Sequence, residues 1–253
     1  MRKLILTICL LTLTVAFADK AFVISGKIVV DHVEPVIENA IPVDVMAFNE
    51  WNNFGGTLEQ IWDGSGMNGY FFDGVYPLVP PSGRPLVWPT NLVSEWYTTY
   101  PPSFSYRDEW SGEAIELLTG YGWVISDLGE SANLNEWHLW NIKSAGNMGV
   151  QTFNVYYANT PTVPPAHGPT QSNQVLEYDF ASGGWTLLNT SGVLFMPQAM
   201  GNNSTPADLV VDMSGVKARY VGIEVITNHG STTRIGLSEQ GMSKTVYSKA
   251  VTQ

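Results

Sequence analysis

The stretch Ala218–Glu239 constrains the fold of this 253-residue chain more than any other part of it. From Tyr220 to Val225, every second residue is a branched aliphatic one. This period of two is typical of a strand with one buried face. The strand runs into the turn-forming sequence Asn228–Ser231, and a second apolar segment, Ile235–Leu237, follows it. The stretch therefore predicts two strands joined by a tight turn.

The first 18 residues have the pattern of a secretory signal peptide. Arg2 and Lys3 precede the apolar run Leu4–Phe17, and Ala16–Ala18 forms an A-x-A cleavage site. The alternative is an uncleaved membrane anchor, which the shortness of the apolar run disfavours. We expect Asp19 to begin the mature protein. A secreted protein is predicted, located outside the cell, in a periplasm or at the cell surface.

Composition excludes several classes of partner and chemistry. The formal charge is −11 and no basic patch is visible, so nucleic acid and anionic membrane are poor partners. The single cysteine, Cys9, lies in the segment predicted to be removed, so the mature chain is expected to have no disulfide. No second apolar segment predicts a membrane span in the mature chain. Few charges, with 9 Trp and 11 Tyr, favour an exported β-rich fold with long ordered loops.

Short segments of strand-like sequence recur along the chain with turn signals between them. They are Ala21–Asp31, with Gly26 as a bend, Ile41–Phe48, Gly122–Gly129, Leu134–Ile142, Val150–Tyr157, Trp185–Leu188, Val193–Met196 and Asp208–Met213. This order predicts an all-β, two-sheet sandwich. Residues 70–119 are rich in proline and aromatic residues and are predicted to form a long ordered loop inserted into a single domain.

Several of these motifs resemble discoidin-type domains, also called factor V/VIII C-type or galactose-binding-like domains, in their bacterial secreted members. The resemblance rests on Arg219–Val221, Asn228, Gly230 and Gly236–Glu239, and on the strand motif GWVISDLG at residues 122–129. It covers about residues 120–242. It implies a discoidin-like jelly-roll β-sandwich over residues 19–242, followed by a polar tail, residues 243–253.

A structural calcium ion is a further implication of this resemblance. The sequence DGSGM at residues 63–67 resembles the family loop that holds calcium, which a glutamate of the last strand closes. The implied ligands are Asp63, Ser65 and Glu239. The residues themselves offer oxygen ligands and glycines for a tight bend, although Asp63 could equally cap the turn. Where the family continues into an apolar strand, this chain reads Gln240–Met242, which predicts an early end of the last strand.

Two sets of residues are candidates for ligand binding. The first set is aromatic and lies in the predicted long loop: Trp88, Trp96, Tyr97 and Trp110. Aromatic faces stack on the apolar face of a sugar ring, but large aromatics equally fill cores. The second set is Asn228 and His229, where Asn228 could alternatively serve as a turn residue. Arg219 is expected to pair with an acid of the sandwich.

The sequence lacks the common catalytic motifs. There is no Gly-x-Ser-x-Gly, no His-Glu-x-x-His, no phosphate-binding glycine loop and no cysteine nucleophile in the mature chain. The four histidines, at positions 32, 138, 167 and 229, have no metal-ligand spacing. Adjacent acids such as Asp108 and Glu109 are typical of a solvated loop. We therefore expect a protein that is not an enzyme.

Together these features predict a secreted, non-catalytic, lectin-like module that binds a glycan or an extracellular polysaccharide. The alternative is a structural or adhesive extracellular or surface protein that binds other proteins or copies of itself. Sugar binding predicts exposed aromatics, whereas self-assembly predicts an apolar patch or an open strand edge. A hydrolase would place two carboxylates across a cleft.

Overall fold

The computed structural model describes residues 21–24, 27–30, 33–50, 58–62, 96–99, 115–116, 119–142, 146–170, 174–198, 207–231 and 234–249. The chain divides into two compact units, Met1–Ile37 with Thr245–Gln253, and Glu38–Lys244. In the first unit, β1 (Ala21–Ile24) and β2 (Lys27–Val30) pair antiparallel, so the predicted first strand segment is a pair of strands. The predicted signal peptide, residues 1–18, lies outside the described residues.

Strands make up nearly all regular structure of the second unit. They are β4 (Asp44–Ala47), β5 (Trp96–Thr99), β6 (Ile115–Glu116), β7 (Trp123–Asn141), β8 (Val150–Ala158), β9 (Trp185–Leu187), β10 (Leu194–Phe195), β11 (Leu209–Asp212) and β12 (Lys217–Asn228). The strands β3 (Val33–Asn39) and β13 (Arg234–Lys249) cross the boundary between the units. Three short 3-10 helices, η1 (Leu58–Ile61), η5 (Gly146–Met148) and η6 (Phe180–Ser182), complete the described elements. The all-β prediction is confirmed. Within the described ranges, no helix has the length and apolar character needed to cross a membrane.

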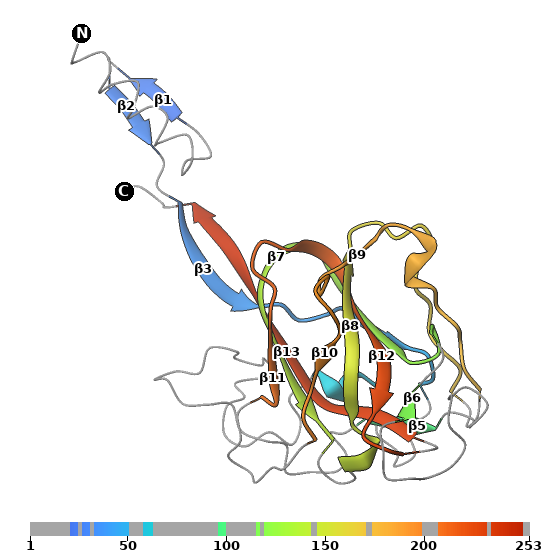
Figure 1. Cartoon of the computed structure of the whole chain (residues 1–253). Helices are drawn as coiled ribbons and strands as arrows, with labels where there is room; N and C mark the ends of the chain where they lie inside the picture. The colour runs from blue at the N-terminus through green and yellow to red at the C-terminus, as the bar shows by residue number, and fades with distance from the viewer. Residues whose placement is uncertain are drawn as a thin grey trace. The chain divides into compact units, whose positions relative to one another are not determined.

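The strands pair in the order β10-β8-β12-β7-β13-β3 (Figure 1). Pairing outside this path joins β4 and β11 to β7, β5 to β13, β6 to β12 and β9 to β8. Before residues 129–131, β7 pairs with β4 and β12, and after them it pairs with β12 again, at Ala132 and Asn133, and with β11. Between the halves, residues 129–131 are exposed and Gly129 has a φ of 76°. Because β7 has pairing partners on both sides of this exposed stretch, the described strands β3 to β13 belong to one 11-stranded sheet.

The core lies between these strands and is rich in tryptophan. Trp123, Trp137 and Trp140, all on β7, are fully buried. On β12 the predicted alternation holds for the aliphatic positions, since Val221 and Ile223 are fully buried. Burying such side chains contributes about 1.5–3 kcal/mol each, so this layer supplies much of the stability.

The prediction that β12 is only half-buried is wrong. Glu224 is buried as well, and Gly222 is packed so tightly that a Cβ there would lie 2.9 Å from the Phe180 ring. Phe180 also stacks on Tyr156, with ring centroids 4.4 Å apart. The segment around η6 therefore covers the second face of β12.

The last strand does not end early, contrary to the expectation from Gln240–Met242. β13 runs to Lys249, and Met242 is buried while its carbonyl accepts a 2.8 Å hydrogen bond from Ala40 N–H. Ser243 Oγ accepts from Glu136 N–H at 3.3 Å. Backbone pairing with neighbouring strands can continue a strand whatever its side chains are. For this reason the weak apolar character of Gln240–Met242 did not indicate the end of the strand. Residues 243–249 of the predicted tail are therefore strand.

Candidate functional site

The turn between β12 and β13 is built around the Asn228 side chain. Asn228 is fully buried. Its Nδ2 donates to the carbonyls of Ser231 at 2.7 Å and Arg234 at 3.1 Å, and its Oδ1 accepts from Gly230 N–H at 3.0 Å. A buried side-chain amide needs such partners. In this structure Asn228 shapes the turn and presents the residue that follows it, His229.

His229 lies beside an aromatic residue that the sequence analysis did not select. Its Nε2 is 3.0 Å from the carbonyl oxygen of Met196, and its ring centroid is 6.3 Å from that of Phe195. The Phe195 side chain is 57% exposed. Burial lowers the pKa of His229, although backbone contacts with Met196 and Val150 oppose this shift, and Nε2 is the donor to the Met196 carbonyl because a carbonyl oxygen can only accept. The short apolar run at residues 193–196 was the one available sequence signal for Phe195.

Two further strands flank this turn. On β5, Trp96 is opposite Leu237 and Tyr97 is opposite Gly236, both on β13. On β6, Ile115 is opposite Asn228. The backbone pairing thus brings β5, which carries the predicted positions Trp96 and Tyr97, beside the start of β13, which follows the turn with Asn228 and His229. Figure 1 shows β5 and β6 close to each other. The other two predicted aromatics, Trp88 and Trp110, lie outside the described residues.

Glu239, the predicted closing ligand of the calcium site, is fully buried on β13. Its Oε1 accepts a 3.4 Å hydrogen bond from Gln240 N–H. A carboxylate taken out of water needs a compensating cation or strong donors. Asp63 and Ser65 lie outside the described residues, and the residue before them, Trp62, stacks on Trp137 at 6.2 Å. The described ranges contain no group of three or more His, Cys, Asp or Glu residues that could hold a metal.

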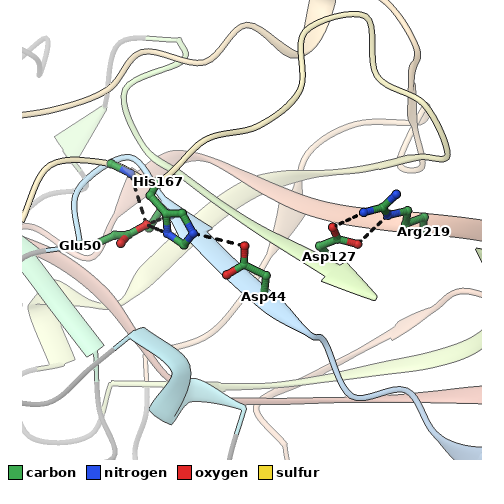
Figure 2. A network of polar contacts seen from close by, with 7 residues as sticks. Asp44, Glu50, Asp127, His167 and Arg219 are labelled. Carbon is green, nitrogen blue, oxygen red and sulfur yellow. Dashed lines mark hydrogen bonds and ion pairs between the residues drawn. The ribbon is translucent and has the colours of Figure 1, made fainter. Parts of the chain in front are cut away.

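Arg219 pairs with Asp127, as expected from the sequence. The guanidinium donates to both carboxylate oxygens at 2.8 Å, and Gly129 N–H donates to Oδ1 at 2.7 Å. Burial alone would raise the pKa of Asp127. The hydrogen bonds and the charge of Arg219 outweigh burial and hold this pKa below its ordinary value. Figure 2 shows the pair beside a second cluster.

The second cluster contains one histidine between two acids. His167 Nδ1 is 2.8 Å from Glu50 Oε1, and His167 Nε2 is 3.2 Å from Asp44 Oδ2 (Figure 2). His167 is half exposed at the surface. Another histidine, His138, lies 3.0 Å from Glu136 alone. His138 and His167 thus each contact at least one carboxylate. His32 lies outside the described residues.

Asp208 directly precedes β11 and contacts Asn141, the last residue of β7. Its Oδ2 accepts a 2.8 Å hydrogen bond from Asn141 N–H. Burial raises the pKa of Asp208 to about 6, and this hydrogen bond only partly opposes that rise. The Asn141 side chain donates to the carbonyls of Val150 and Pro197, so it holds the chain beside Phe195 in place.

No family model matches the chain, and no curated protein matches it. Among solved structures it is similar to the lectin domain of lectinolysin complexed with Lewis B antigen, at 16% identity and a TM-score of 0.40, covering 81% of this chain and 95% of that one. It is also similar to the CBM32 of AlyQ in complex with 4,5-unsaturated mannuronic acid, at 12% identity and a TM-score of 0.36, covering 81% and 97%.

A third similar structure is the family 89 glycoside hydrolase from Clostridium perfringens in complex with 2-acetamido-1,2-dideoxynojirmycin. Its identity to this chain is 15% and the TM-score is 0.37. The match covers 81% of this chain but 14% of the hydrolase, so the chain spans a small part of that enzyme.

Proposed function

We propose that this protein is a secreted, non-catalytic carbohydrate-binding module with a structural calcium ion. Its ligand is a glycan or an extracellular polysaccharide. The observation that carries the proposal is the 57% exposure of Phe195 beside His229, at the end of the sandwich where β5 and β13 pair. Large aromatic side chains are usually mostly buried, so an exposed one at a loop end suits stacking on a sugar ring.

The surroundings of Phe195 suit a rigid binding surface. Phe195 pairs with Thr152 of β8, and the next residue, Met196, donates its N–H to the Gln151 carbonyl at 2.8 Å. The His229 ring is held at 3.0 Å from the Met196 carbonyl. A fixed aromatic face with polar groups at its rim can bind a sugar without the entropy cost of ordering a loop.

Two buried acids, Glu224 and Asp127, have structural partners. Glu224 accepts from Tyr156 Oη at 3.1 Å and from Gly120 N–H at 3.2 Å. Asp127 is held by Arg219. These carboxylates serve structural contacts, whereas a glycosidase needs a pair of acids facing each other across a substrate.

The glycan proposal is tested by a polysaccharide and glycan array with the full chain. We expect wild type to bind at least one glycan class and Phe195→Ala to lose about tenfold or more in affinity, since one stacking aromatic contributes about 1–3 kcal/mol. The matched control is Tyr247→Ala, because Tyr247 is also 57% exposed but lies in the other unit. No binding by wild type, or equal binding by Phe195→Ala, would contradict the proposal.

In the calcium proposal, Asp63, Ser65 and Glu239 supply hard oxygen ligands, and the ion links the loop to β13. Its test is thermal unfolding with calcium and with chelator. Binding to the folded state alone stabilises by about 2.7 kcal/mol at a hundredfold excess over Kd, so Tm is expected to rise with calcium. Glu239→Gln is expected to abolish the rise. The control is Glu224→Gln, which changes another buried carboxylate and is expected to preserve it. A Tm unaffected by calcium in wild type would exclude the ion.

An adhesive role through self-association is a second candidate, because β3 ends the path of paired strands. Val36 and Ile37 on this strand are 42% and 48% exposed. An open edge with exposed aliphatic side chains is a template for strand pairing. Sedimentation of the full chain over a concentration series tests it. Association that Ile37→Lys abolishes would favour this candidate, and a monomer at all concentrations would exclude it.

A further inference from the structure

Each ring nitrogen of His167 lies at hydrogen-bonding distance from a different carboxylate. Nδ1 is 2.8 Å from Glu50 Oε1 and Nε2 is 3.2 Å from Asp44 Oδ2. A neutral imidazole carries one N–H, whereas the imidazolium carries two. In the neutral form, one nitrogen lone pair would therefore face a carboxylate. Only the protonated ring donates to both acids, so this arrangement is the geometry of the imidazolium.

The acids that hold His167 come from one stretch of chain and the histidine from another. Asp44 is the first residue of β4, and Glu50 follows that strand closely. His167 lies in the segment between β8 and η6, 117 residues from Glu50 in the sequence. The contact therefore ties this segment to β4 (Figure 2).

The neighbouring backbone shows how closely the segment lies on β4. Glu50 N–H donates to the Pro169 carbonyl at 2.9 Å, and Gly168 N–H donates to Glu50 Oε1 at 3.2 Å. A Cβ at Gly168 would lie 2.1 Å from the Ala47 carbonyl oxygen, so no side chain fits there. Glu50 Oε1 thus accepts from His167, from Gly168 N–H and, at 3.4 Å, from Ala47 N–H.

We propose that His167 is a proton-operated clamp that fixes the segment around Gly168 against β4 and loosens when the ring loses its proton. On deprotonation, one proton passes to solvent, one hydrogen bond is lost, and Asp44 and Glu50 keep their negative charges around a neutral ring. Two further charges belong to Asp127, the cross-strand partner of Asp44, and to Arg219, which is bound to Asp127.

The direction of the titration agrees with this geometry. Burial lowers the pKa of His167, but the hydrogen bonds and charges of Glu50 and Asp44 raise it, and the net pKa lies above the ordinary histidine value. A raised pKa in the folded state means that the clamp stabilises fully below the unfolded value of about 6.5. This stabilisation is lost as the pH rises through the folded-state pKa. The half-exposed ring keeps the contribution to global stability modest, so the effect is local.

The test follows the His167 ring and the Gly168 amide in the full chain by NMR. We expect His167 to titrate above about 6.5, the ordinary value, and both Asp44→Asn and Glu50→Gln to lower its pKa. We also expect the protection of the Gly168 amide against hydrogen exchange to fall as the pH rises through the pKa of His167. This comparison is made after correction for the intrinsic pH dependence of exchange.

Two variants separate a titrating clamp from a merely structural side chain. His167→Gln keeps an N–H donor but cannot titrate, so the pH step in Gly168 protection is expected to vanish while the protein stays folded. His138→Gln removes a histidine that contacts one acid, Glu136, and is expected to leave the step unchanged. A His167 pKa at or below the ordinary value, or a step that persists in His167→Gln, would overturn the proposal.

Discussion

Arg219 binds Asp127 through two hydrogen bonds of 2.8 Å, one from Nε and one from the terminal nitrogen Nη2. The register between β7 and β12 shifts between Ala218 and Tyr220, so Arg219 lies at an irregularity of the strand. Such irregularities re-aim a side chain. Here the guanidinium reaches the acid of the neighbouring strand and also lies 4.8 Å from the centre of the Tyr220 ring.

Replacing this arginine is expected to change the acid stability of the protein. The pKa of Asp127 is lowered in the folded state, so the pair stabilises above the unfolded value of about 3.9 and loses this effect as the pH falls through the folded-state pKa. Arg219→Gln is therefore expected to lower Tm at neutral pH, with a deficit that shrinks below pH ~4. Thermal unfolding over a pH series measures it. The control is Lys244→Gln, which removes a 3.9 Å contact between Lys244 Nζ and the exposed Glu130 carboxylate. An equal decrease in Tm in this variant would contradict the specific role of Arg219.

Neutralising Asp208 is expected to stabilise the protein at neutral pH. Burial raises the folded-state pKa of this acid to about 6, so its ionisation opposes folding as the pH rises from about 4 through 6. Asp208→Asn keeps an oxygen acceptor for Asn141 N–H but carries no charge. We expect a gain of about 1 kcal/mol at pH 7, because partial exposure reduces the full effect, and no gain at pH 3. Urea unfolding at both pH values measures it, and a loss at pH 7 would contradict the argument.

The Asn189 side chain lies between β9 and β10 and is expected to be important for holding this segment against β8. Its Oδ1 accepts from Val155 N–H at 2.8 Å, and its Nδ2 donates to Asn154 Oδ1 and to the Gly192 carbonyl. Asn189→Ala leaves the buried Val155 N–H without this acceptor and is expected to cost about 2 kcal/mol in the free energy of unfolding. The control is Asn159→Ala, which removes one exposed hydrogen bond to the Lys217 carbonyl. If chemical unfolding gave the same cost for both substitutions, burial of the Asn189 hydrogen bonds would not make them more important than an exposed one.

Gly222 is expected to tolerate no side chain. A Cβ there would lie 2.9 Å from Phe180 Cε1 and 3.1 Å from Ile125 Cγ1, so Gly222→Ala is expected to cost about 1–3 kcal/mol through overpacking. Phe180→Leu withdraws the ring edge. In a double-mutant cycle by chemical unfolding, the two changes together are therefore expected to cost less than the sum of the single costs. Additive costs would show that Phe180 does not limit this position.

Several strands could be predicted from the sequence because their signals are local. The motif at residues 122–129 and the alternation from Val150 to Tyr157 correspond to the first half of β7 and to β8. The pairing of Arg219 with an acid was also predicted, although its partner was not. The DGSGM loop, Trp88 and Trp110 lie outside the described residues, so the calcium ligands and part of the aromatic set stay predictions.

The sequence by itself determined several strands, such as β8 and β12, because a period of two and turn residues act within a few positions of each other. Only the tertiary structure decided that Glu224 is buried, that Phe195 faces solvent and that His167 lies between two acids. Each of these depends on segments that meet from far along the chain: Phe180 covers β12, β10 pairs with β8, and His167 meets Glu50 across 117 residues. Pairing register and packing set such contacts, and neither is written in the local pattern of residues.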